Sequence, residues 1–224
     1  MNTKFKRILF DFDGTILLHD AEEGIEEIGK VLKLYGVKRK IFMKQLLHFF
    51  NNSEIYYASK IMTYDTYYKT MKYLMPCLGQ YHISPKRVCA AIQTVSKNYT
   101  LLAAGAKETL SYLKEKGYEI CIVTNGFYNE QVDIMKHHGV FEYIDKIYTW
   151  DEAYPKPDIS FITRALEGTD PKENVYIGDS PYTDFDMSKA AGIYTIGYNT
   201  RKQLASDTLP DVEIENFTDL KKIL

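Results

Sequence analysis

The feature that most constrains this chain is a short apolar run that ends in two aspartates near the N-terminus. The run consists of Ile8, Leu9 and Phe10, and it is typical of a central parallel strand covered on both faces. It is followed at once by Asp11 and Asp13. In open α/β sheets the ligand site lies beyond the carboxyl ends of the strands, and strand alternation directs both side chains to one side. The segment therefore predicts a chemically active sheet edge.

Other interpretations of this segment stay open on these residues alone. A D-x-D-G sequence can begin a calcium loop, but such a loop follows a helix and carries its glycine at the sixth position, whereas Gly14 is fourth here. Asp and Gly are also common in plain turns. A receiver-type phosphoacceptor domain places aspartates at strand ends as well, but it is built on a shorter chain. The choice depends on the rest of the sequence.

Composition and charge exclude several classes of protein. The 224 residues are 45% hydrophobic, which suffices for one large domain or a domain with an insert. A net charge of −2 argues against binding of a nucleic-acid polymer, which normally requires a basic excess. The sequence has no apolar run of membrane-spanning length and no signal-type N-terminus. We therefore expect a cytoplasmic protein with no membrane partner, and three reduced, mostly buried cysteines without a C-x-x-C pair.

The segment from Leu17 to about Asn98 has helical periodicity without a strand signal. Four helices are expected: 22–35, ended by Gly36; 41–50, broken at 51–53; 65–75, with Asp65 as its N-cap; and a last one opened by Ser84 and Pro85 and ending near 97. Residues 17–98 contain twelve Lys and Arg against seven Asp and Glu, a net of +5. This excess suits a lid over an anionic substrate, although a helical bundle with random charges would also produce it.

The same segment is rich in aromatic residues. It contains eight tyrosines and three phenylalanines: Tyr35, Tyr56, Tyr57, Tyr64, Tyr67, Tyr68, Tyr73, Tyr81, Phe42, Phe49 and Phe50. Aromatic side chains at helical spacing are more often core residues than a stacking surface for a planar substrate, and both interpretations are retained.

After this segment, strand and helix patterns alternate. Strands are expected at 118–123, 146–149, 174–177, 194–197 and 212–214, and helices at 106–116, 129–138, before 167, 184–191 and at the C-terminus, where Thr218 is the expected cap. Strands that alternate with helices predict a parallel sheet.

Polar residues follow the ends of these strands and are expected to meet at one sheet edge. They are Asp11 and Asp13, Thr124 and Asn125, Lys156, and Asp179 and Asp184. Four carboxylates so close together repel one another by several kcal/mol unless a cation intervenes, and all-oxygen ligation favours Mg²⁺. A magnesium site with one lysine, one hydroxyl and turn amides is a phosphoryl-binding arrangement, in which fixed positive charge offsets that of the transferring group.

Four motifs resemble, in order and spacing, those of the haloacid dehalogenase superfamily. They are D-F-D-G-T at 11–15, T-N-G at 124–126, K-P at 156–157 and G-D-S-P-Y-T-D at 178–184. With K-A-A-G-I at 189–193, the resemblance runs essentially end to end. It implies an α/β fold with a Rossmann-like parallel sheet and helices on both faces, formed by residues 1–16 and 99–224. It also implies an all-helical cap domain, residues 17–98, inserted after the first strand.

The resemblance implies a role for each catalytic position. Asp11 matches the nucleophile that forms an aspartyl-phosphate, and Asp13 matches the general acid and base. Thr124 matches the phosphate-binding hydroxyl, beside the amide of Asn125. The lysine that pairs with the nucleophile and the phosphoryl oxygens is matched by Lys156. These roles agree with the chemistry, because a carboxylate attacks phosphorus only when charge repulsion is neutralised and a second acid handles the proton.

The resemblance also implies how Mg²⁺ is held. Asp179 would ligate the ion together with Asp11 and the backbone carbonyl of Asp13. Asp184 would support the metal through its water shell or through Lys156.

The implied activity is that of a Mg²⁺-dependent phosphatase acting on a small phosphorylated metabolite, as a monomer or homodimer. Dehalogenases of this type lack the second acid of the first motif, so the presence of Asp13 argues against dehalogenation. The opening motif with its helical cap is loosely similar to pyrimidine 5′-nucleotidases of the superfamily, which makes a nucleoside 5′-monophosphate the first substrate expectation. The alternatives are a sugar-phosphate phosphatase, a phosphomutase of the β-phosphoglucomutase kind, and an inactive phosphoprotein-binding module.

Overall fold

The chain folds into two compact units. The computed structural model describes residues 5–19, 21–57, 60–200 and 206–224. One unit comprises Met1–Leu18 and Leu101–Leu224, and the other comprises His19–Thr100. Within the described residues, no helix is both long enough and apolar enough to cross a membrane.

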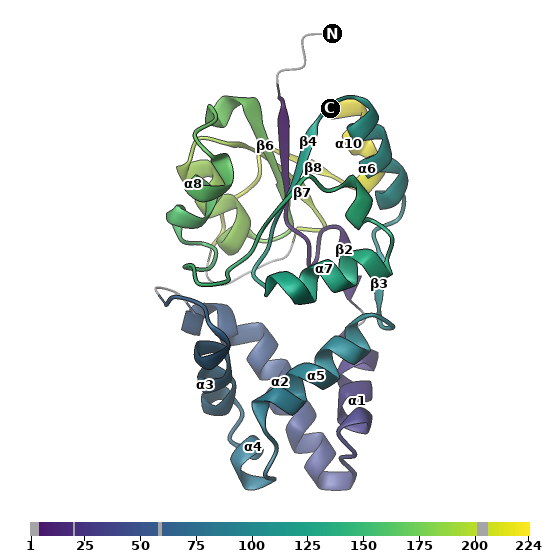
Figure 1. Ribbon diagram of the computed structural model, residues 1–224, viewed down its shortest axis with the longest axis vertical. Coiled ribbons are helices and arrows are strands. Elements are labelled where there is room, and N and C mark those ends of the chain that lie inside the picture. Colours follow the sequence, from purple (N-terminus) through teal and green to yellow (C-terminus); the bar gives the residue numbers. More distant parts are fainter. Residues whose placement is uncertain (1–4, 20, 58–59, 201–205) are drawn as a thin grey trace. The chain divides into compact units, whose positions relative to one another are not determined.

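The first unit is built on a six-stranded sheet in the order β5-β4-β1-β6-β7-β8 (Figure 1). The strands are β1 (Arg7–Phe10), β4 (Glu119–Val123), β5 (Lys146–Tyr148), β6 (Asn174–Gly178), β7 (Tyr194–Tyr198) and β8 (Val212–Ile214). Every neighbouring pair is parallel, as the alternation of strand and helix patterns predicts. All four residues of β1 are buried, because β1 lies in the interior of the sheet and is covered on both faces.

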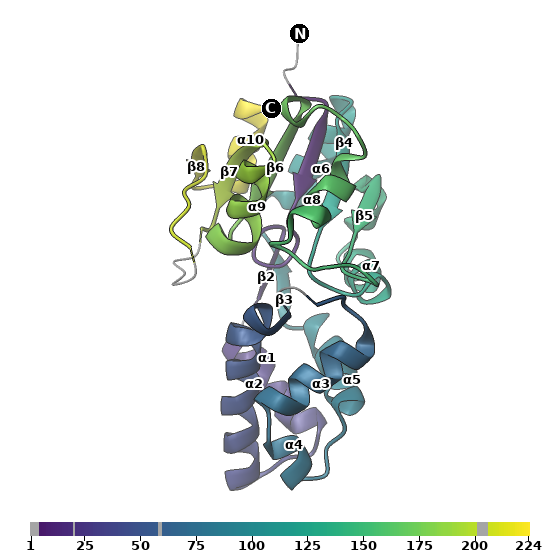
Figure 2. The same ribbon diagram turned by 90° about the vertical axis from the view of Figure 1, so that its left-hand side faces the viewer.

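Helices cover both faces of this sheet, so the predicted Rossmann-like fold is confirmed. They are α6 (Ala106–Glu115), α7 (Tyr128–His137), α8 (Ile159–Leu166), α9 (Asp186–Ala190) and α10 (Leu220–Ile223). Figures 1 and 2 show α8 on one face and α6 and α10 on the other. Side-chain alternation along β1 fits this arrangement, because Ile8 and Phe10 belong to the apolar cluster that includes Leu110 of α6 and Leu220 of α10.

The second unit is helical. Its helices are α1 (Ala21–Val31), α2 (Gly36–Tyr57), α3 (Tyr64–Leu74), α4 (Cys77–Gln80) and α5 (Pro85–Ser96). In Figure 2, α2 runs beside α3. The chain enters and leaves this unit through two short strands that pair with each other, β2 (Leu17–His19) and β3 (Thr100–Leu102). These strands were not predicted, because three residues are too few to show an alternating pattern.

Two expected helix boundaries in this unit are wrong. Gly36 begins α2 rather than ending α1, because Lys33 takes the left-handed conformation (φ 58°) that closes α1 and the amide of Leu34 bonds the carbonyl of Gly29 at 2.9 Å. The expected break at 51–53 lies inside α2. The helix continues because its buried stripe extends through this polar stretch, from Phe42, Leu46 and Phe49 to Ser53 and Tyr57.

Two expected caps are also replaced by neighbouring residues. Thr63, not Asp65, caps α3, because the Thr63 hydroxyl accepts from the amide of Thr66 at 3.1 Å. Asn216, not Thr218, caps the C-terminal turn that leads into α10. By contrast, Ser84 caps α5 and Pro85 opens it, as predicted.

The aromatic residues of the helical unit divide into core and surface positions. Phe42, Phe49 and Tyr57 are buried, and the ring of Tyr67 lies 5.5 Å from that of Phe49 and 5.8 Å from that of Tyr57. Tyr73 is 69% exposed. The buried rings are therefore core residues, as one of the two interpretations predicted, whereas Tyr73 is not.

The cysteines are buried, as predicted. Among the described residues, Cys77, Cys89 and Cys121 form no disulfide bond. Burial raises the pKa of the Cys121 thiol to about 12, which keeps it protonated and unreactive at neutral pH.

Candidate active site

The predicted polar residues lie where strands of the parallel sheet end. Asp11 follows β1, Thr124 follows β4 and Asp179 follows β6. Lys156 lies in the connection between β5 and α8. Because β4, β1 and β6 are parallel and adjacent, their carboxyl ends meet at the same edge of the sheet.

Asp11 is buried between a lysine and a hydroxyl group. Its Oδ1 accepts from Lys156 Nζ at 2.6 Å, and its Oδ2 accepts from the hydroxyl of Thr15 at 3.1 Å. Burial raises the pKa of the Asp11 carboxyl to about 7, and the nearby Lys156 ammonium only partly offsets this rise. An Asp11 that is to act as an anion at neutral pH thus needs more positive charge than Lys156 supplies.

Lys156 is buried, and its ammonium group contacts three oxygen atoms and lies 5.9 Å from the centre of the Tyr176 ring. Its Nζ donates to Asp11 Oδ1, to Asp184 Oδ1 at 2.7 Å and to the hydroxyl oxygen of Tyr176 at 3.2 Å. Burial alone would lower the pKa of Lys156, but the carboxylates of Asp11 and Asp184 raise it well above its ordinary value. Lys156 is therefore a permanent positive charge that serves two carboxylates at once.

Asp184 is held by hydrogen bonds on both of its oxygens. Oδ1 contacts Lys156 and accepts from the hydroxyl of Tyr176 at 2.9 Å. Oδ2 accepts from the backbone amides of Asp179 and Ser180, at 3.1 and 3.0 Å. Asp184 thus connects the lysine to the turn that carries Asp179.

The helix expected to start at Asp184 begins two residues later, at Asp186. Residues Pro181–Phe185 form a wider π-type turn instead. The hydroxyl of Ser180 accepts from the amide of Thr183, and Asp184 reaches back to the amides that begin the turn. The wide turn is the local structure that satisfies these amides, and polar capping of this kind is not visible in hydrophobic periodicity.

Asp179 is completely buried and packs against the turn that follows β1. A Cβ atom on Gly14 would lie 2.5 Å from Asp179 Oδ2, and Gly14 has a positive φ of 96°. Both facts require glycine at this position, because only glycine adopts this conformation easily and leaves room for the carboxylate. The glycine of the D-x-D-G motif is thus required by the carboxylate of Asp179, which follows a different strand, β6.

Three of these carboxylates are close enough to share one cation. Asp11, Asp179 and Asp184 each offer an oxygen, and these atoms all lie within 4.8 Å of one another. All three side chains are buried, and an exclusively oxygen donor set suits a hard divalent cation such as Mg²⁺. Each oxygen of Asp184 accepts from two donors, whereas Asp11 accepts one hydrogen bond from Lys156 and one from Thr15. Asp11 and Asp179 are therefore the better candidates for direct ligands.

Thr124 and Asn125 follow β4 and contact the segments that bear β5 and Lys156. The amide of Thr124 bonds the carbonyl of Tyr148 at 3.0 Å, and its side chain is buried. The side chain of Asn125 forms two hydrogen bonds with the backbone of Lys156. Its Nδ2 donates to the Lys156 carbonyl at 3.2 Å, and its Oδ1 accepts from the Lys156 amide at 2.9 Å. Asn125 therefore fixes the position of the lysine backbone.

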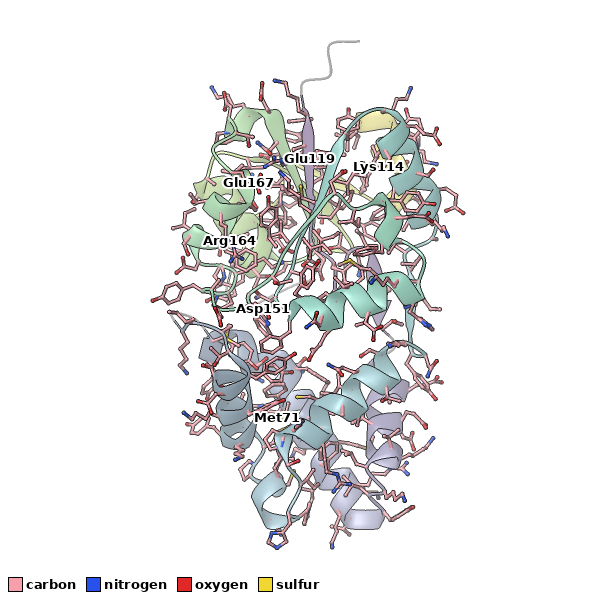
Figure 3. The ribbon with its side chains drawn as sticks, viewed as in Figure 1. Met71, Lys114, Glu119, Asp151, Arg164 and Glu167 are labelled. Carbon is pink, nitrogen blue, oxygen red and sulfur yellow. The ribbon has the colours of Figure 1, made fainter. Side chains whose placement is uncertain are left out.

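The loop before Lys156 is tied to the start of α7 by Asp151 (Figure 3). Asp151 Oδ2 accepts from the amide of Tyr128 at 2.7 Å and from the hydroxyl of Thr149 at 2.7 Å. Arg164 of α8 donates to the carbonyl of Thr149. The carboxylate thus caps the first turn of α7, where a negative charge is favoured by the helix dipole.

Two site residues were missed by sequence reasoning. Tyr176 lies within β6, and its signal was a hydroxyl between the apolar residues Val175 and Ile177. Gln131 lies on α7 beside the buried Ile134 and Met135, and its Nε2 donates to Asp13 Oδ2 at 3.2 Å. Its signal was a polar residue on the apolar face of a helix. Asp13 itself is half-buried, whereas Asp11 is buried.

This arrangement can bind and polarise a phosphoryl group. It combines a buried carboxylate next to a permanent ammonium, a second carboxyl two residues away, and a set of oxygens that fits a divalent cation. Such a combination offsets negative charge around a reacting phosphorus and supplies a group for proton transfer.

Comparison with known proteins connects this geometry to a family. Residues 8–198 match the family model described as haloacid dehalogenase-like hydrolase. The pyrimidine 5′-nucleotidase PynA of Streptococcus pneumoniae is 26% identical in an alignment that covers 96% of this chain and 93% of the relative. The pyrophosphatase PpaX of Bacillus velezensis is 36% identical over 52% of this chain and 56% of its own length.

Other curated relatives match over a shorter region. The phosphoglycolate phosphatase of Pseudomonas putida is 28% identical, and the match covers 56% of this chain and 48% of the relative. The chain thus spans about half the length of several of the curated relatives it matches.

A solved structure agrees on the fold. The HAD hydrolase YfnB from Bacillus subtilis, bound to magnesium, has a TM-score of 0.75 at 19% identity and covers 99% of both chains. Since the family model spans most of the sequence and the fold agrees, the chain belongs to the haloacid dehalogenase-like hydrolases.

Proposed function

We propose that this protein is a Mg²⁺-dependent phosphatase that hydrolyses a small phosphomonoester through an aspartyl-phosphate on Asp11. The observation that carries the proposal is the 2.6 Å contact between Asp11 Oδ1 and Lys156 Nζ, within a set of carboxylates that fits a divalent cation. Burying this ion pair opposes folding, because both charges lose their hydration. A functional role accounts for a pair that stability alone does not favour.

Asp11 and Asp179 would hold Mg²⁺ through their side chains, and Asp13 would contribute its backbone carbonyl. Asp184 would support the site through Lys156. When bound, Mg²⁺ supplies positive charge that keeps Asp11 ionised and offsets the charge of the phosphoryl oxygens.

The residues of the chain then divide the reaction into two steps. In the first, a carboxylate oxygen of Asp11 forms a bond to phosphorus, the ester P–O bond breaks, and the leaving oxygen takes the proton of Asp13. In the second, water attacks phosphorus and gives a proton to Asp13, and the bond between phosphorus and Asp11 breaks to release phosphate. Lys156 stays protonated and contacts the phosphoryl oxygens together with Thr124 and the amide of Asn125.

A nucleoside 5′-monophosphate is the proposed substrate. The support is PynA, a protein named as a pyrimidine 5′-nucleotidase that is similar over nearly the full length of both chains. In this proposal the helical unit, His19–Thr100, is the cap that selects the substrate, and its basic residues favour an anion. The protein would act in the cytoplasm as a monomer or homodimer, without binding a nucleic-acid polymer or a membrane.

A phosphomonoester of a small organic acid is the second candidate. Several relatives that match over about half their length are named phosphoglycolate phosphatases. A sugar phosphate and a phosphomutase reaction remain further alternatives. An inactive phosphoprotein-binding module is less well supported, because Asp11, Asp13, Lys156 and Asp179 are all present.

A phosphate-release assay tests the proposal. The purified protein with Mg²⁺ is offered pyrimidine and purine nucleoside 5′-monophosphates, phosphoglycolate, sugar phosphates and p-nitrophenyl phosphate. We expect turnover of p-nitrophenyl phosphate and a preference for pyrimidine nucleotides among the metabolites, both abolished in Asp11→Asn. Activity that survives in Asp11→Asn would reject the mechanism, and a preference for phosphoglycolate would replace the substrate.

A further inference from the structure

Gln131 lies where α7 approaches the acid of the first motif. It belongs to the second turn of α7, and its side chain is 93% buried, with 7% exposed. Its backbone amide bonds the carbonyl of Phe127, and Asp151 caps the first turn of the same helix through the amide of Tyr128. The hydrogen bonds at the start of α7 therefore fix the backbone that carries the Gln131 side chain.

The contact of Gln131 with Asp13 is accommodated by a glycine. Its Nε2 donates to Asp13 Oδ2 at 3.2 Å. A Cβ atom on Gly126 would lie 2.4 Å from that Nε2 and 2.9 Å from the Gln131 Cγ. The Gln131 side chain thus lies directly on the backbone of the T-N-G motif, and any larger residue at 126 would displace it.

The amide of Gln131 is poorly satisfied for a purely structural group. Among the described residues, its buried Oε1 has no hydrogen-bond partner. A buried acceptor without a partner opposes folding, and an unbranched apolar side chain of similar shape would avoid that cost. Stability therefore does not account for an amide at this position, whereas its one hydrogen bond is to Asp13.

We infer that Gln131 is a positioning residue that holds the Asp13 carboxyl in the orientation from which it transfers protons. The inference rests on the proposed function. The Nε2 donor fits Asp13 when it is a carboxylate, since a carboxylate only accepts.

The test is a double-mutant cycle of Gln131→Met with Asp13→Asn, assayed on an alkyl and an aryl phosphate. Gln131→Met keeps the shape of the side chain and removes the donor. We expect kcat for the alkyl phosphate to fall about 10- to 100-fold, the effect of one hydrogen bond to a charged group, with KM little changed. The loss should be smaller for p-nitrophenyl phosphate, whose leaving group needs little protonation.

In the Asp13→Asn background, Gln131→Met should cause no further loss, because a residue that acts through Asp13 has nothing left to position. Losses that multiply in the double variant, or that are equal for both substrates, would show a general structural role and overturn the inference. If Gln131→Met fails to fold, Gln131→Glu replaces it, because a carboxylate of the same shape cannot donate to Asp13 and should cause at least as large a loss.

Asn129→Ala is the matched control. Asn129 is exposed on the first turn of the same helix, and its substitution should change neither kcat nor the leaving-group dependence. An effect as large as that of Gln131→Met would overturn the inference. The proposed function is judged separately, on the wild type: a wild type without phosphatase activity rejects that function, whereas an active wild type with an unaffected Gln131→Met rejects only the role of Gln131.

Discussion

The hydroxyl of Tyr176, a completely buried residue of β6, donates to Asp184 Oδ1 at 2.9 Å. The hydroxyl oxygen of Tyr176 accepts from Lys156 Nζ at 3.2 Å. Burial and the adjacent Asp184 carboxylate raise the pKa of Tyr176 well above its ordinary value, so the hydroxyl stays protonated. A side chain in the middle of a strand thus completes the hydrogen bonding of both the lysine and the supporting aspartate.

Tyr176→Phe should impair the reaction more than it impairs folding. The variant removes the hydrogen bonds of the Tyr176 hydroxyl with Lys156 and Asp184 and leaves Lys156 and Asp184 in contact. We expect a loss of about 1–3 kcal/mol in stability, as for a buried hydrogen bond to a charged group, and a lower kcat because Lys156 loses part of its alignment. Thermal unfolding and phosphate release measure the two effects. An unchanged kcat would remove Tyr176 from the site.

The burial of Asp11 predicts an unusual pH dependence of stability in the metal-free protein. Its pKa is about 7 in the folded state against an ordinary value of 3.8. Because the folded state then holds a proton that the unfolded state has lost, the contribution of Asp11 to stability falls as the pH rises from about 4 through 7. We expect the Tm of Asp11→Asn minus that of the wild type to increase over this range in chelator.

Scanning calorimetry at several pH values measures that difference. Comparison with Asp11→Asn removes the contribution of the other acids, which titrate in both proteins. A Tm difference that stays constant between pH 4 and 7 would mean that burial does not perturb this carboxyl.

The strand ends could be predicted from the sequence because the signal there is local. An apolar run followed by Asp11 specifies both a buried strand and a carboxylate at its end, and the parallel topology then brings Asp179 beside it. The contact of Asp179 with Gly14 could not be predicted. The carboxylate of Asp179, which follows β6, occupies the space that a Cβ atom on Gly14 would need. Hydrophobic periodicity contains no information about a contact of this kind.

The side chains that hold the site in place were harder to foresee for the same reason. The bonds of Asn125 to Lys156 and of Asp151 to Tyr128 connect residues that are far apart in sequence and satisfy backbone groups rather than side chains. Likewise, the helix that continues through 51–53 is decided by a buried stripe, which overrides the low helix propensity of Asn and Ser.

Mg²⁺ should stabilise the protein through Asp11 and Asp179. A ligand that binds only the folded state raises stability by about 2.7 kcal/mol at 100 times its Kd, so saturating Mg²⁺ should raise the Tm measurably. Asp179→Asn should abolish most of this rise, and chelator should abolish turnover of the wild type. Glu173→Gln is the matched control and should retain the full rise, because Glu173 is a half-buried residue before β6 whose carboxylate contacts Lys6. Full activity in chelator would contradict the metal site.

The two aspartates of the first motif should fail at different steps. Asp11→Asn removes the nucleophile, so activity on every substrate should vanish. Asp13→Asn keeps the nucleophile and removes proton transfer, which typically contributes ~10²–10⁴-fold in rate. An alkyl phosphate should then react slowly from the start, because its leaving oxygen departs poorly without a proton.

An aryl phosphate separates the steps in Asp13→Asn. Its leaving group needs little protonation, so the first step should be largely retained while hydrolysis of the aspartyl-phosphate stays slow. Stopped-flow measurement should show a burst of about one phenol per enzyme, followed by a slow phase. Mass spectrometry of the quenched protein should locate the phosphate on Asp11. If Asp13→Asn turns over both substrates at the wild-type rate, Asp13 is not the acid and base, and the hydrogen bond from Gln131 has no catalytic purpose.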